Sequence, residues 1–182
     1  MTIVYLTVGF PGSGKSTWSK AKAKQDNVVI INLDSIREML KADYVSESKI
    51  ESVVKKIAKD ALHHCMDKGF NIIIDQTNLS AKTRAEWVGL VQAEDSSAKI
   101  VAVCFTEMDS KILLDRRMTN PRGYKRSKWA MIISNMKNYY TPVGSNEGFN
   151  ETIMVDAQGN ETGSSKKSSA AAAPAKSWGF VG

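Results

Sequence analysis

The chain alternates short apolar runs with longer segments in which apolar residues recur every three or four positions. The apolar runs predict strands at 2–8, 28–32, 71–75, 99–105 and 152–155. Uninterrupted runs of this kind are typical of parallel strands, because helices cover both faces of a parallel sheet. The sequence therefore predicts that most of these strands lie buried in the centre of the fold.

Helical repeats occupy the segments between the predicted strands. The clearest one spans 46–68, where apolar residues three and four apart continue up to Gly69, a typical residue after a helix end. Weaker repeats predict further helices at 15–24, 35–42, 80–93, 108–118 and 127–140. Alternating strands and helices predict an α/β fold of three layers, in which helices flank a five-stranded, mainly parallel sheet.

The composition changes near Gln158. From there to the end the chain is rich in Ser, Ala and Gly and has few apolar residues to bury. We therefore predict a single domain over 1–157 and a disordered C-terminal tail over 158–182. The apolar residues Trp178 and Phe180 at its end could bind a partner protein, although a terminus without a role is the simpler interpretation.

A phosphate-binding loop follows the first predicted strand. The stretch GFPGSGKST has two glycines five residues apart, followed directly by Lys15 and Ser16. Gly12 and Gly14 lack a Cβ, so the backbone can adopt positive φ and bring its N–H groups to phosphate oxygens. Lys15 is suited to bind the β and γ phosphates, and Ser16 to ligate Mg²⁺. The predicted nucleotide-binding residues are Gly9, Pro11, Gly12, Ser13, Gly14, Lys15, Ser16 and Thr17.

Charged residues follow the second predicted strand, at the edge of a parallel sheet where ligands bind. Asp34 and Arg37 are three residues apart and would share one face of a helix. Asp34 is a candidate general base for phosphoryl transfer to a hydroxyl group. Arg37 could bind an acceptor phosphate or hold Asp34 ionised. The alternative is that Asp34 caps the helix and Arg37 pairs with it at the surface.

Polar residues also follow the third predicted strand. Asp75 is placed to contact Mg²⁺ through water or to orient Arg37. Thr77 and Asn78 could hydrogen-bond the acceptor. They could equally cap the next helix, a role that we assign mainly to Ser80.

Basic residues concentrate between the last two predicted helices. The cluster comprises Lys111, Arg116, Arg117, Arg122, Lys125, Arg126 and Lys128. Pro121 and Gly123 interrupt the helical pattern, so we predict an arginine-rich lid over about 117–128. Such a lid would bring an arginine to the transferring phosphoryl group and exclude water. A solvated basic surface is the alternative, and we expect it to account for three or four of these charges.

Composition and charge narrow the functional class. The 182 residues are 42% hydrophobic, carry a net charge of +6 and include two cysteines, Cys65 and Cys104. This length fits one domain with a substantial core, and the positive charge favours an anionic partner such as nucleic acid. Two isolated cysteines predict buried thiols in a reducing compartment. Because no apolar run is long enough to cross a membrane, we expect a cytoplasmic protein without a membrane partner.

Four blocks in this order, GFPGSGKST, NLDSIR, IIIDQTN and RRMTNPRG, resemble the kinase domain of phage polynucleotide kinases, which phosphorylate the 5′-hydroxyl ends of DNA and RNA. The resemblance covers about 1–142. It implies a P-loop kinase fold, ATP as donor, Mg²⁺ as cofactor, nucleic acid 5′ ends as substrate and, for a phage-encoded protein, the host cytoplasm as location.

The same resemblance assigns roles to individual residues. It implies that Lys15 and Ser16 bind phosphates and Mg²⁺, that Asp34 is the general base and that Arg37 contacts the acceptor phosphate. Asp75, Thr77 and Asn78 would flank the acceptor, with Asp75 also beside the metal. A lid arginine would stabilise the transition state. We favour Arg122, which precedes Gly123, whereas Arg116 or Arg117 could share that role, and Arg117 would contact the nucleotide.

Other acceptors and another class of function remain open from the sequence. Related small kinases phosphorylate a hydroxymethyl pyrimidine in DNA, a sugar, an antibiotic or, in the zeta-toxin-like group, a nucleotide-sugar. A nucleotide-dependent switch without phosphoryl transfer is the second class. Asp34 distinguishes the classes, because a switch needs no base beside the γ-phosphate.

Overall fold

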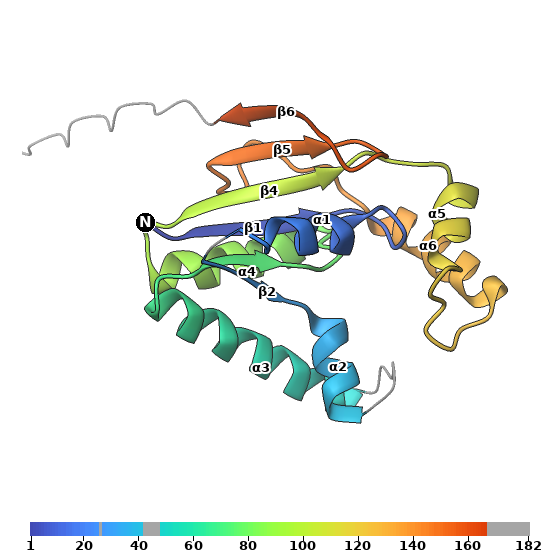
Figure 1. Ribbon diagram of the computed structural model, residues 1–182, viewed down its shortest axis with the longest axis horizontal. Coiled ribbons are helices and arrows are strands. Elements are labelled where there is room, and N and C mark those ends of the chain that lie inside the picture. Colours follow the sequence, from blue (N-terminus) through green and yellow to red (C-terminus); the bar gives the residue numbers. More distant parts are fainter. Residues whose placement is uncertain (26, 42–47, 167–182) are drawn as a thin grey trace, which may run out of the picture.

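Six strands form one central sheet in the structure, a computed structural model that describes residues 1–25, 27–41 and 48–166. The strands are β1 (Ile3–Val8), β2 (Val28–Ile31), β3 (Asn71–Ile74), β4 (Lys99–Phe105), β5 (Glu151–Val155) and β6 (Glu161–Lys166). Their order in the sheet is β2-β3-β1-β4-β5-β6, and the first five pair in parallel (Figure 1). The predicted mainly parallel sheet is confirmed.

Six helices in the described part of the chain surround this sheet (Figure 1). They are α1 (Lys15–Lys22), α2 (Leu33–Lys41), α3 (Ser48–Asp67), α4 (Ala81–Glu94), α5 (Ser110–Arg117) and α6 (Arg126–Tyr139). Helices α3 and α4 pack on one face of the sheet and α1 on the other, whereas α5 and α6 pack together beyond the carboxyl ends of the strands. The three-layer α/β arrangement predicted from the sequence is therefore present.

Alternate side chains of β1 fill two cores, one on each face of the sheet. Val4 and Leu6 lie in the cluster that includes Val54 and Leu62 of α3. Tyr5 points to the opposite face, where its ring meets that of Trp18 on α1 edge-on at 5.9 Å between centroids. Burial of one such apolar side chain contributes about 1.5–3 kcal/mol to stability. Consecutive apolar residues in β1 thus hold helices on both faces.

The segment 161–166 differs from the prediction of a disordered tail after residue 157. It forms β6, which pairs antiparallel with β5 and gives the sheet a sixth strand in place of the five predicted. Its sequence, ETGSSK, is exposed at every position. The strand is held by backbone hydrogen bonds rather than by burial, so a search for apolar runs misses it. Residues 167–182, including Trp178 and Phe180, lie outside the described residues.

A buried arginine joins the end of β3 to the segment before β5. The Arg84 side chain is fully buried and donates to Glu147 through Nε and Nη2 at 2.6 and 2.7 Å. Its Nη1 donates to the carbonyl oxygens of Asn78, Leu79 and Thr141 at 3.0–3.1 Å. A buried charge of this kind is tolerated only where its donors are paired. Arg84 therefore fixes the loop that leads from β3 into α4.

Two further sequence expectations concern the cysteines and the membrane. Cys65 and Cys104 are both free thiols and are partly rather than fully buried. Burial raises the pKa of the Cys104 thiol to about 11. Among the helices of the described residues, none has the length and apolar character needed to span a bilayer.

Candidate active site

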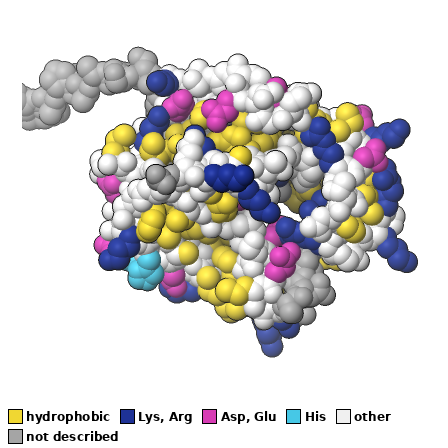
Figure 2. All heavy atoms as spheres, in the orientation of Figure 1, with side chains coloured by type: hydrophobic (Ala, Val, Ile, Leu, Met, Phe, Trp, Pro, Cys, Tyr) yellow, Lys and Arg dark blue, Asp and Glu magenta, His cyan; other side chains and the backbone are white. Residues whose placement is uncertain are grey.

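A cavity of about 580 Å³ opens beyond the carboxyl ends of β1, β2 and β3. The predicted site residues that line it are Pro11, Gly12, Gly14, Lys15, Ser16, Thr17, Asp34, Arg37, Asp75, Thr77, Arg116, Arg117 and Arg122. In Figure 2 a hollow separates the α5–α6 part of the molecule from the rest, with Lys and Arg side chains at its edges. Four segments that are distant in sequence therefore meet at one site.

The phosphate loop takes the conformation that its glycines predict. Gly12 and Gly14 have φ of 83° and 100°, in the left-handed region. A Cβ on Gly12 would lie 2.3 Å from the carbonyl oxygen of Leu113, so the loop also needs glycine to pack against α5. Helix α1 begins at Lys15, directly after this turn, and its N-terminal N–H groups are suited to bind phosphate.

Lys15 is held in the cavity as a buried cation. Its side chain is 8% exposed, and Nζ donates to the carbonyl oxygen of Phe10 at 2.7 Å. Burial lowers the pKa of Lys15 to about 8, although the nearby carboxylates of Asp75 and Asp34 act in the opposite direction. A bound anion would supply the charge compensation that this ammonium group lacks.

Asp34 and Arg37 are joined, and a third residue fixes their geometry. Arg37 Nη1 donates to Asp34 Oδ1 at 2.6 Å, as their spacing on α2 predicts. Arg37 Nε and Nη2 donate to both carboxylate oxygens of Glu51 on α3, at 2.6 and 2.7 Å. The Arg37 side chain is only 13% exposed, so this arrangement differs from the surface pair that was the alternative. Glu51 lies in a separate helix, and no sequence pattern connects it with Arg37.

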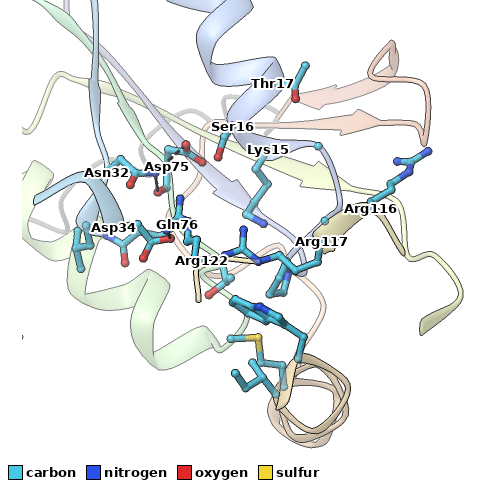
Figure 3. A pocket seen from close by; sticks show the side chains of 18 of the residues that line it. Lys15, Ser16, Thr17, Asn32, Asp34, Asp75, Gln76, Arg116, Arg117 and Arg122 are labelled. Atoms are coloured by element: carbon cyan, nitrogen blue, oxygen red, sulfur yellow. Dashed lines mark hydrogen bonds and ion pairs between the residues drawn. The ribbon is translucent and has the colours of Figure 1, made fainter. Parts of the chain in front are cut away.

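Asn32 links the ends of β2 and β3. Its Nδ2 donates to Asp75 Oδ2 at 2.9 Å and to the Asp75 carbonyl oxygen at 3.0 Å. Its Oδ1 accepts a hydrogen bond from the backbone N–H of Ser35 at 2.9 Å, so Asn32 caps the start of α2. The sequence had left open that Asp34 serves as this cap. Asp75 is 5% exposed and faces the cavity (Figure 3). Asn32 was not among the predicted site residues.

The segment between α5 and α6 crosses to α2. Arg122, which has a φ of 49°, forms an ion pair with Asp34. The Arg117 guanidinium lies over the Trp129 ring, 4.0 Å from its centroid. Arg116 donates instead to the carbonyl oxygen of Ala157 at 3.0 Å. Figure 3 shows Arg117 and Arg122 on the side of Lys15 and Asp34, with Arg116 pointing away.

Three predicted site residues do not reach the cavity. Gly9 and Ser13 belong to the phosphate loop but do not line the cavity, and a Cβ on Gly9 would approach Ser13 Oγ to 2.8 Å. Asn78 is 1% exposed and donates through Nδ2 to the Thr7 carbonyl oxygen at 2.9 Å. This contact joins the end of β3 to β1. The prediction that Asn78 contacts the acceptor is therefore wrong, because its amide points away from the cavity. Thr77 does line the cavity, and Ser80 caps α4 as predicted.

The residues present fit the Mg²⁺ site that the sequence predicts. No cluster of three or more His, Cys, Asp or Glu side chains suited to a metal occurs among the described residues. Mg²⁺ in nucleotide sites is usually bound by one or two protein oxygens together with phosphates and water. Ser16 and Asp75 line the same cavity and supply such oxygens. They are the residues that would hold the ion beside a nucleotide.

Residues 4–138 match a protein family described as an AAA domain. The chain belongs to this family. The chain shares 28% sequence identity with a chain in the solved Pnkp1/Rnl/Hen1 complex, with a TM-score of 0.58 over 63% of this chain and 38% of that one. It therefore spans less than half the length of that protein.

Two solved structures of which this chain covers a larger share are similar to it in fold. A putative kinase from Chloroflexus aurantiacus has a TM-score of 0.65 at 15% identity, over 85% of this chain and 88% of that one. A chain of the PezAT toxin–antitoxin system of Streptococcus pneumoniae has a TM-score of 0.61 at 16% identity, over 90% and 71%. The chain thus has the P-loop kinase fold.

Proposed function

We propose that the protein is an ATP-dependent kinase that transfers the γ-phosphoryl group to the 5′-hydroxyl end of DNA or RNA. The observation that carries this proposal is the position of Asp34. Its carboxylate lines the same cavity as Lys15 and Ser16, and Arg37 and Arg122 hold it there. A protein that only binds nucleotide needs no carboxylate at this position.

Each residue has a step in the proposed reaction. Asp34 orients the 5′-hydroxyl and accepts its proton while the hydroxyl oxygen bonds to the γ-phosphorus and the bond from that phosphorus to the β–γ bridging oxygen breaks. ADP is the leaving group. Lys15 and the loop N–H groups bind the β and γ phosphates, and Arg122 neutralises charge on the transferring group. Ser16 and Asp75 would hold Mg²⁺, which when bound supplies positive charge that reduces the repulsion between the phosphates.

The acceptor side of the cavity supports a phosphate-bearing substrate. Arg37 is held by Glu51 through two hydrogen bonds, which fixes the plane of its guanidinium. Its Nη1 contacts Asp34. A phosphate on the 3′ side of the first nucleotide, bound by Arg37, would therefore lie next to the proposed general base, Asp34. Thr77 and Arg117 line the same cavity and would contact acceptor and donor respectively.

Two broader observations support nucleic acid over a small alcohol. The chain carries a net charge of +6. It is also 28% identical, over part of its length, to one chain of the Pnkp1/Rnl/Hen1 complex, which is named an RNA repair complex. Positive charge accelerates the binding of polyanions.

Two free thiols fit a reducing compartment, and we propose the cytoplasm as the location.

An acceptor panel tests this proposal. Labelled γ-phosphate from ATP is offered to 5′-hydroxyl DNA and RNA strands, to the same strands with a 5′ phosphate, to DNA with a hydroxymethyl pyrimidine and to sugars. We expect label only on strands with a free 5′-hydroxyl, and the 5′-phosphorylated strands are the matched control. Label on a modified base or a sugar, with none on strand ends, would overturn the proposed acceptor.

A further inference from the structure

A second, smaller cavity of about 190 Å³ lies between α3 and α4. Leu33 and Gln76 line both this cavity and the larger one, so the two adjoin at the ends of β2 and β3. The smaller cavity contains none of the residues assigned to nucleotide binding or transfer. A strand whose first nucleotide occupies the larger cavity could therefore continue into the smaller one.

Three lysines surround the smaller cavity. Lys55 and Lys59 are one turn apart on α3, and Lys82 is in the first turn of α4. All three side chains are exposed, and none forms an ion pair with another residue of the described ranges. Glu86 is the one acidic side chain at this cavity, so the local charge is positive. This surface fits phosphodiester groups better than a neutral ligand.

The floor of the smaller cavity is apolar. Leu33, Trp87 and Leu90 form it, and Trp87 is only 7% exposed. Gln76 lies between the cavities, and its buried Nε2 has no hydrogen-bond partner among the described residues. Figure 3 places Gln76 among Asp34, Asp75 and Arg122. A buried amide donor without a partner is costly unless a ligand supplies an acceptor.

We propose that this cavity binds the second nucleotide of a single-stranded polynucleotide, on the 3′ side of the acceptor. The lysines bind its phosphates, the apolar floor covers part of its base, and Gln76 Nε2 donates to an oxygen or ring nitrogen between the first and second nucleotides. The inference rests on the proposed function and makes it more specific: the preferred substrate is a strand of at least two nucleotides, not a mononucleotide.

The test uses two triple variants of the full chain. The cavity variant combines Lys55→Gln, Lys59→Gln and Lys82→Gln. The control variant removes the same charge from exposed lysines that line neither cavity, by Lys20→Gln, Lys56→Gln and Lys68→Gln. All six positions are on the surface, so neither variant is expected to alter the fold. Both variants keep every residue of the proposed transfer site.

Binding is measured by fluorescence anisotropy with a short single-stranded DNA that carries a 5′ phosphate, and by competition with a nucleoside 3′-phosphate. For the cavity variant we expect the Kd of the strand to rise at least about tenfold, with little change for the nucleoside 3′-phosphate. Because each neutralised phosphate on a single strand contributes about 0.7 to the slope of log K against log salt, the loss of contacts to the two phosphates that flank the second nucleotide should reduce that slope by about 1.4. The control variant should change the Kd of the strand much less.

Phosphate transfer to a 5′-hydroxyl strand, measured in parallel, separates the two proposals. If the cavity and control variants bind the strand equally well, the second-nucleotide site is wrong, whether or not the strand is phosphorylated. If the cavity variant alone loses strand binding but the wild-type protein phosphorylates no strand end, the site is supported and the proposed kinase activity is contradicted.

Discussion

Arg122, in the segment between α5 and α6, forms an ion pair with Asp34 at the start of α2. The other oxygen of this carboxylate accepts a hydrogen bond from Arg37 at 2.6 Å. Both oxygens of the proposed base are therefore engaged by guanidinium groups. An incoming triphosphate offers Arg122 a stronger partner, because it carries more negative charge than one carboxylate. Nucleotide binding should thus move Arg122 from Asp34 to the γ-phosphate and leave Asp34 Oδ2 available to the acceptor.

Replacement of Arg122 tests this exchange. We expect Arg122→Gln to lower kcat for phosphate transfer by about a thousandfold or more, the range found for arginines that stabilise phosphoryl transfer. The affinity for ATP should fall much less. Arg126→Gln is the control, because Arg126 pairs with Asp115 at the exposed surface. Steady-state kinetics with each substrate varied in turn measures both effects. A wild-type kcat in Arg122→Gln would contradict the assigned role.

The pKa of Lys15 predicts a pH-dependent affinity for nucleotide. Burial lowers this pKa to about 8 in the protein without nucleotide, and bound phosphates would raise it again. Above about pH 8 the amine must therefore take up a proton when ATP binds, so the Kd of ATP should rise with pH there. Titration calorimetry in buffers of different ionisation enthalpy measures the proton uptake. Lys15→Met should bind more weakly and lack this uptake, and equal proton uptake in both proteins would refute the assignment.

The two loop glycines should differ in their tolerance of alanine. Both have positive φ, which costs about 1–2 kcal/mol for a residue with a Cβ. Nothing lies within 4 Å of a Cβ on Gly14, whereas a Cβ on Gly12 would meet the Leu113 carbonyl oxygen at 2.3 Å. We expect Gly14→Ala to lower the free energy of unfolding by about 1–2 kcal/mol and Gly12→Ala to lower it clearly more. Urea denaturation measures both values, and equal losses would contradict the packing of the loop on α5.

Removal of Arg84 should destabilise the fold. Arg84→Met removes the cationic partner of Glu147 and the guanidinium donor of four carbonyl oxygens, of which that of Leu79 keeps a hydrogen bond from the Thr141 N–H. We expect a loss of about 3–5 kcal/mol in the free energy of unfolding. Glu147→Gln, which keeps hydrogen-bonding capacity at the same size, should cost less. Chemical denaturation of the two variants and the wild type provides the comparison. A loss below about 1 kcal/mol for Arg84→Met would mean that the pair contributes no more than a surface one.

The same pair predicts a loss of stability in acid. Burial alone would raise the pKa of Glu147, but the hydrogen bonds from Arg84 and from the Gly144 N–H lower it below its usual 4.5. The unfolded state therefore binds a proton at a higher pH than the folded state does. The stabilisation is complete above the usual pKa and is lost as the pH falls below about 4.5 through the folded value. Glu147→Gln should weaken this dependence in urea titrations at several pH values.

Local patterns in the sequence predicted the parts of the molecule that are specified by neighbouring residues. The apolar runs placed β1 to β5, because strands buried on both faces must be apolar. The spacing of the phosphate loop predicted the positive φ of Gly12 and Gly14, since only glycine adopts this turn without strain. The three-residue spacing of Asp34 and Arg37 predicted their contact, because α2 brings such positions to one face.

Contacts between distant segments could not be predicted in this way. Glu51 reaches Arg37 only because α2 and α3 pack together, and Asn32 reaches Asp75 only because β2 and β3 are neighbours in the sheet. Asn78 looked like a ligand residue from its place after β3, but the approach of β1 turns its amide inward to the Thr7 carbonyl oxygen. Strand β6 carries no apolar residue, so its pairing with β5 left no signal in the pattern.

The central claim, that Asp34 is the base for transfer to a 5′-hydroxyl end, is tested most directly by single-turnover transfer from ATP to a 5′-hydroxyl DNA strand in wild type and Asp34→Asn. The variant keeps the size of the side chain and a hydrogen-bonding oxygen but removes the negative charge that accepts the proton. We expect the transfer rate to fall by about 10²–10⁴, with the Kd of ATP changed little. A rate within a few-fold of wild type, in a variant that binds both substrates, would contradict the account.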